Sequence, residues 1–97
     1  FMPYVLVFNR KVIEGKIKRL AAYLGLEPSF DAFLEWILEL RRALNVPHTL
    51  QEFGVGRENF AIMAKMAPDD PTAGGNPVKL TEADALSLFE KAFNGAL

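Results

Sequence analysis

The 97-residue sequence contains no cysteine and only one histidine, His48. Without cysteine the chain has no disulfide bond, no thiolate ligand for zinc and no cysteine nucleophile. A single imidazole excludes a metal site built from several histidines of this chain. The lack of cysteine also fits a reducing compartment, so we expect a cytoplasmic protein.

Long apolar runs and a basic excess are lacking too. The longest apolar run covers residues 2–8 and includes Pro3, whereas a membrane span needs about 20 residues. No signal-peptide pattern is present. Lys and Arg number 11 against 12 Asp and Glu, and nucleic-acid binding normally requires a clear basic excess. We therefore expect no membrane and no nucleic-acid partner, and we interpret the basic residues near the N-terminus as a solvated helix face: Arg10, Lys11, Lys16, Lys18 and Arg19.

What the sequence has is apolar side chains. Hydrophobic residues make up 51% of the chain, which excludes intrinsic disorder. The length fits one small domain, residues 1–97. Small domains bury only about 60–65% of the surface that their unfolded chain exposes. We therefore expect some apolar surface to remain exposed, as is typical of a partner surface.

The hydrophobic spacing is helical throughout and predicts an all-α bundle of about five helices without a sheet. The predicted helices cover residues 3–9, 12–24, 30–44, 57–67 and a last segment that begins after Thr81. A strand over residues 4–8 is the alternative to the first helix, because Val and aromatic residues favour strands. Gly25 and Asn45 are expected to end helices in a left-handed conformation. Ser29 and Thr81 are expected to cap helix N-termini, and Thr49 with Glu52 matches a capping box.

Few residues are candidates for chemistry. His48 lies between a proline and a helix cap, which indicates a polar loop residue rather than a catalytic base. Asp69 and Asp70 are adjacent in a loop, without further metal ligands at a suitable spacing. Gly74-Gly75 lacks the Lys-Ser/Thr of a phosphate-binding loop. The residues by themselves predict a helical domain without its own active site. Such a domain could function as a free-standing interaction module that binds a partner helix through residues 30–44.

An ordered series of short motifs nevertheless resembles the C-terminal segment of the iron-containing alcohol dehydrogenases. The opening run of residues 2–9, the helix end at Leu24-Gly25-Leu26 and the Val46-Pro47 segment match that family in order. The second half continues the match with Gly54-Val55, Phe60, Met63-Ala64, Asp70, Asn76-Pro77 and Leu80-Thr81-Glu82-Ala83-Asp84. The resemblance covers essentially the whole chain.

The resemblance implies a dehydroquinate-synthase-like fold, of which residues 1–97 would be the C-terminal helical subdomain. In that family a Rossmann-like half binds NAD(P), and a helical half holds Fe2+ or another divalent metal through an Asp and three His. The metal polarises the oxygen of an alcohol, aldehyde or ketone while hydride passes to or from the nicotinamide. The cofactor-binding residues and metal ligands would all lie upstream, so we expect no cofactor, no metal and no catalytic residue in this chain, and no activity of the chain alone.

The resemblance also implies a role for one loop and a partner surface. In relatives the segment before Asn-Pro lies near the substrate cleft and often carries a Cys, where this chain has Thr72. Thr72 and Asn76 are therefore the candidate residues beside the cleft. The expected partners are the upstream domains of the same protein or a second copy in a homodimer. We expect the contact surface to be an exposed apolar patch above about 400 Å² that includes Tyr4, Val5 and Phe8.

Overall fold

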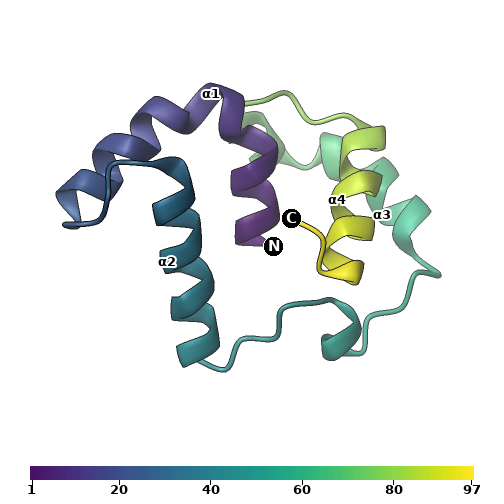
Figure 1. Cartoon of the computed structure of the whole chain (residues 1–97). Helices are drawn as coiled ribbons and strands as arrows, with labels where there is room; N and C mark the ends of the chain where they lie inside the picture. Colours follow the sequence, from purple (N-terminus) through teal and green to yellow (C-terminus); the bar gives the residue numbers. More distant parts are fainter. The chain divides into compact units, whose positions relative to one another are not determined.

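A computed structural model describes all residues from 1 to 97 and shows an all-helical protein without strands (Figure 1). It contains four α-helices and three short 3-10 turns. The chain forms two compact units, Phe1–Pro47 and His48–Leu97. The all-α prediction is confirmed. The number of helices is smaller than predicted, and no helix has the combination of length and apolar character that crossing a membrane requires.

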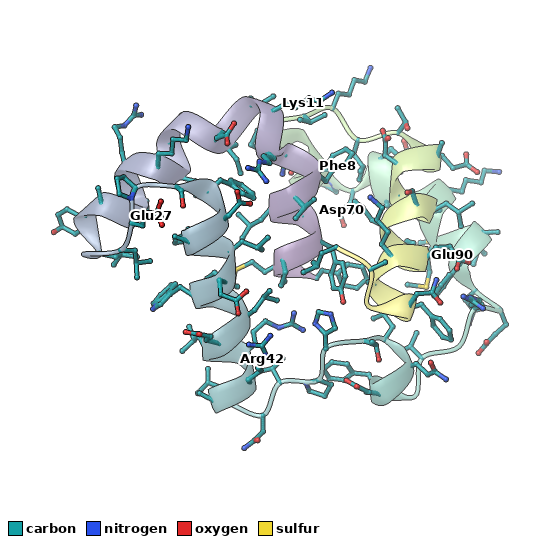
Figure 2. All side chains as sticks on the ribbon, viewed as in Figure 1. Phe8, Lys11, Glu27, Arg42, Asp70 and Glu90 are labelled. Carbon is teal, nitrogen blue, oxygen red and sulfur yellow. The ribbon has the colours of Figure 1, made fainter.

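The first unit consists of α1 (Met2–Tyr23) and α2 (Phe30–Ala43). The prediction of separate helices over residues 3–9 and 12–24 was wrong, because the residues between them include neither Pro nor Gly and continue the helix. Figure 1 shows that α1 instead bends sharply, close to Lys11, which Figure 2 labels. One bent helix therefore takes the place of the two predicted ones.

The core of the first unit lies between α2 and both arms of α1. Its buried side chains are Ile17, Ala21, Phe30, Phe33 and Ile37. Partly buried residues from both arms of α1 pack on this cluster, among them Leu6, Val7 and Ile13. A helix with a wide apolar arc needs contacts on more than one side, and the two arms of α1 provide them for α2.

Local capping fixes where these helices begin and end. The Ser29 hydroxyl accepts a hydrogen bond from the amide of Ala32, as predicted for an N-cap. Gly25 ends α1 with φ of 75°, and the amide of Leu26 donates to the carbonyl of Ala21. Asn45 ends α2 in the same way with φ of 54°. These are the left-handed helix ends that the sequence predicts.

The second unit packs α3 (Phe60–Met66) against α4 (Glu82–Asn94). The buried side chains are Phe60, Ala64, Ala85, Leu88 and Ala92. The ring of Phe60 lies 5.5 Å from that of Phe89 and 5.9 Å from that of Phe93. The predicted helix over residues 57–67 is shorter in the structure. Its first residues form a turn that Arg57 holds to α4 through a 3.0 Å ion pair with Glu90.

The expectation that Tyr4, Val5 and Phe8 belong to an exposed apolar patch was wrong for Tyr4, although Phe1 and Met2 at the same terminus are exposed. Tyr4 is 3% exposed, and Val5 and Phe8 are partly buried. Periodicity shows that residues 4–8 are apolar on every side, but it does not show which side the fold covers. Large apolar side chains are exposed elsewhere in both units, including Tyr23, Leu44, Phe53, Ile62 and Met66.

Candidate functional site

The candidate site is the segment between α3 and α4, which carries both residues predicted to lie beside a substrate cleft. It begins with two 3-10 turns, Ala67–Asp69 and Pro71–Gly75. Prolines stand at the start of each turn, where a missing amide hydrogen costs little. A stretch without regular secondary structure, bent at residues 76–78, then leads to Thr81, the N-cap of α4. The loop in which the sequence places Asp69 and Asp70 is thus mostly turned structure.

Asp70 organises the second turn. Its Oδ1 atom accepts hydrogen bonds from the Thr72 amide at 2.8 Å and from the Thr72 hydroxyl. Both hydrogen bonds stabilise the ionised carboxylate, and they hold the pKa of Asp70 below its ordinary value. The hydroxyl proton of Thr72 is therefore engaged within the turn.

Asn76 follows the turn and lines a hollow of about 410 Å³. Its side-chain amide donates to the carbonyl of Val78 at 2.6 Å, which fixes its orientation. The other lining residues come from the same segment: Pro68, Asp69, Ala73, Gly74, Lys79 and Leu80. Thr72 does not line this hollow, so the structure brings one of the two predicted residues to it. A volume of this size falls within the range of small-molecule sites.

A second hollow of about 500 Å³ lies beside it in the same unit. It is lined by Met63, Met66, Ala67 and Phe89 from the helices and by Asp69 and Asp70 from the turns. Sequence reasoning missed this hollow, because hydrophobic spacing places Met63 and Phe89 on the core-facing sides of their helices. One signal was available: α3 has a single polar residue, Lys65, so apolar side chains had to point outward as well as inward.

His48 lies at the end of α4 rather than at either hollow. Its Nε2 atom is 3.2 Å from the carbonyl oxygen of Gly95, and its backbone amide donates to Glu52 at 2.7 Å. Gly95 has φ of 75°, and a Cβ added there would come within 3.1 Å of the His48 ring. His48 was interpreted as a polar loop residue, and the structure places this loop residue against the C-terminal end of α4.

A family comparison covers almost the whole chain. The model of the Fe-containing alcohol dehydrogenase family, C-terminal, matches residues 1–93. The chain therefore belongs to the Fe-containing alcohol dehydrogenase family and represents its C-terminal domain. The resemblance inferred from the sequence motifs is confirmed.

Individual relatives agree with this assignment. The NADPH-dependent butanol dehydrogenase of Clostridium saccharobutylicum is 26% identical over 104 residues, covering 98% of this chain and 27% of the relative. Lactaldehyde reductase of Escherichia coli (strain K12) is 29% identical, with 95% and 26% covered. The 1,3-propanediol dehydrogenase of Citrobacter freundii is 28% identical, again with 95% and 26% covered. The chain thus spans about a quarter of the length of these relatives. The comparison with solved structures found no significant match to this chain.

The family name implies iron, and the side chains of this chain do not fit an iron site on their own. No group of three or more His, Cys, Asp or Glu side chains lies together. The imidazole of His48 faces the Gly95 carbonyl, and the Asp70 carboxylate holds Thr72. A protein site for such a metal needs about three ligands in fixed geometry.

Proposed function

We propose that this chain is the C-terminal helical part of an NAD(P)-dependent, metal-dependent alcohol dehydrogenase of the cytoplasm. The complete enzyme would interconvert alcohols with aldehydes or ketones by hydride transfer. The observation that carries the proposal is the family match over residues 1–93. The names of the relatives support it, since butanol dehydrogenase, lactaldehyde reductase and 1,3-propanediol dehydrogenase all describe redox chemistry of small alcohols or aldehydes.

The division of labour within the enzyme is the second part of the proposal. Iron or another divalent metal, and the nicotinamide cofactor, would be held by residues outside this chain. Residues 1–97 would contribute packing and one wall of the substrate cleft. Asn76 is the better supported of the two cleft candidates, because it lines a hollow and its amide is oriented by Val78. Thr72 would shape the turn through Asp70.

The test is the activity of the complete polypeptide that carries this chain. We expect the purified protein, supplied with Fe2+, to oxidise NADH or NADPH when a short aldehyde such as butanal or lactaldehyde is added. Residues 1–97 alone, as the matched control, should give the same rate as buffer. A complete polypeptide that is folded, yet inactive with Fe2+, Zn2+ or Mg2+ and with either nucleotide, would contradict the proposal.

A further inference from the structure

Helix α3 is apolar on all of its sides. Lys65 is the only polar residue among its seven. One face, with Phe60 and Ala64, is buried in the core of the second unit. The opposite side leaves Ile62 60% exposed and Met66 64% exposed. A helix that is hydrophobic all round is normally covered all round. In this chain, α3 is covered on one side only.

The uncovered side of α3 forms one wall of the larger hollow. We call this hollow the methionine groove: Met63, Met66, Ala67 and Phe89 form its apolar surface, and Asp69 and Asp70 complete its lining. Phe89 is anchored, because its ring stacks 5.5 Å from that of the buried Phe60. Methionine side chains are unbranched and polarisable, so they adapt to the shape of an incoming apolar group. The groove thus joins a fixed aromatic surface to an adaptable wall.

The two carboxylates set the charge of the groove. Neither Asp69 nor Asp70 is part of an ion pair in the structure. Asp70 is held ionised by its two hydrogen bonds from Thr72. Carboxylates beside an apolar surface favour an occupant with an apolar body and a cationic group, because an ion pair forms where the apolar surfaces meet.

The length of the relatives indicates where such an occupant comes from. The chain covers 27% of the butanol dehydrogenase and 26% of the lactaldehyde reductase that it matches. We propose that the methionine groove is the docking surface for an apolar segment with a Lys or Arg, which belongs to the remaining part of the same dehydrogenase polypeptide. This inference rests on the proposed function, since only the longer enzyme supplies that segment.

The test measures oxidation of methionine to its sulfoxide by hydrogen peroxide, followed by peptide mass spectrometry. In the complete polypeptide, we expect Met66 to oxidise at least about tenfold more slowly than in the same protein unfolded in urea, since a covered side chain reacts only after local opening. In residues 1–97 alone, Met66 should oxidise within about twofold of the unfolded rate, because it is largely exposed.

A charge variant tests the cationic part of the occupant. Asp69→Asn removes one carboxylate of the groove, and Asp70 is left intact because it holds Thr72. In the complete polypeptide we expect Met66 to oxidise about fivefold faster in this variant, the factor that corresponds to an interaction of about 1 kcal/mol. Glu58→Gln is the matched control, because Glu58 is exposed in the same unit and does not line the groove. The Glu58→Gln variant should leave the oxidation rate of Met66 unchanged.

Three results would overturn the inference. Equal oxidation rates of Met66 in the folded and unfolded complete polypeptide would show that nothing docks there. Protection in residues 1–97 alone that grows with their concentration would make a second copy the occupant. An unchanged oxidation rate of Met66 in the Asp69→Asn variant would show that the occupant places no cationic group beside Asp69. The readout needs no turnover, so an inactive enzyme with a protected Met66 refutes the proposed function alone, whereas an active enzyme with an exposed Met66 refutes the docking alone.

Discussion

The two units of this chain are both all-helical, but they differ in the length of their helices and in the size of their buried side chains. The first unit uses two long helices, α1 of 22 residues and α2 of 14, and buries large side chains such as Phe30, Phe33 and Ile37. The second uses α3 of seven residues and α4 of 13, joined through short turns. Three of its five buried hydrophobic residues are alanines.

This difference shows where each unit obtains its stability. Burial stabilises in proportion to the apolar area removed from water, about 25 cal/mol per Å². Alanines let α3 and α4 approach closely but bury little area each. The second unit therefore depends on few large buried side chains, Phe60 and Leu88, on the partly buried rings that pack against Phe60, and on hydrogen bonds that fix its turns and helix ends. It is also the unit that carries both hollows and the candidate site.

The largest expected effect is that of removing the central ring of each unit. Phe60→Ala should cost about 3–5 kcal/mol, as is usual for a buried Phe, and should abolish amide-exchange protection in α3 and α4. Phe30→Ala carries a similar cost in the first unit, but Phe33 and Ile37 remain there to hold α1 and α2. Hydrogen exchange resolved by residue measures both variants. Greater loss of protection around Phe30 than around Phe60 would reverse the comparison.

Removing a helix cap should have the next largest effect on the free energy of unfolding. Thr81 forms a reciprocal capping box with Asp84: the Thr81 hydroxyl accepts from the Asp84 amide at 3.2 Å, and the Asp84 carboxylate accepts from the Thr81 amide at 3.0 Å. Thr81→Ala should therefore cost about 1–2 kcal/mol. Ser29→Ala, which removes one accepted hydrogen bond in the first unit, should cost about 1 kcal/mol or less. Urea unfolding measures the loss in free energy of unfolding for both variants. A larger loss for Ser29→Ala than for Thr81→Ala would contradict the account.

A glycine pair tests the first unit with opposite signs. Gly15 lies exposed within α1, and a Cβ added there would contact nothing within 4 Å. Gly15→Ala should raise the free energy of unfolding by about 0.5–1 kcal/mol, because alanine loses less freedom in a helix. Gly25 has equal space but φ of 75°, so Gly25→Ala should lower it by about 1 kcal/mol. Thermal unfolding of both variants checks the signs; changes of the same sign would be inconsistent with this structure.

The smallest effect is the acid sensitivity of the Asp70 turn. The hydrogen bonds from Thr72 lower the pKa of Asp70 from its ordinary value of 3.8. A depressed folded pKa means that the contribution is present above 3.8 and is lost as the pH falls through the folded value. The amide chemical shift of Thr72, followed by NMR, should titrate with a midpoint below 3.8. The step should vanish in Asp70→Asn, and a midpoint at or above 3.8 would contradict the geometry.

The features that were predictable from the sequence are local ones. Ser29, Thr81, Gly25 and Asn45 act within a few residues of themselves, so short patterns identified each of them correctly. The family, too, was recognisable, because its motifs follow one another in order along the chain.

The features that were not predictable depend on contacts between distant residues. The hydrophobic spacing of residues 3–24 did not show that one bent helix would replace two. One bent helix and two separate helices would both direct the same apolar side chains toward α2. The burial of Tyr4 was missed for a related reason, because it lies in a segment that is apolar on every side. At the candidate site, Asn76 could be selected from the motif, whereas the hollow that it lines exists only after the turns have packed.

The most direct test of the central claim is reconstitution from two pieces. The proposal under test is that residues 1–97 serve as a structural part of a dehydrogenase whose metal and cofactor are held by residues outside this chain. The complete polypeptide, truncated immediately before Phe1, should not oxidise NAD(P)H with a short aldehyde, and adding residues 1–97 should restore the activity until the binding saturates. A truncated polypeptide that keeps its full activity without this chain would contradict the account.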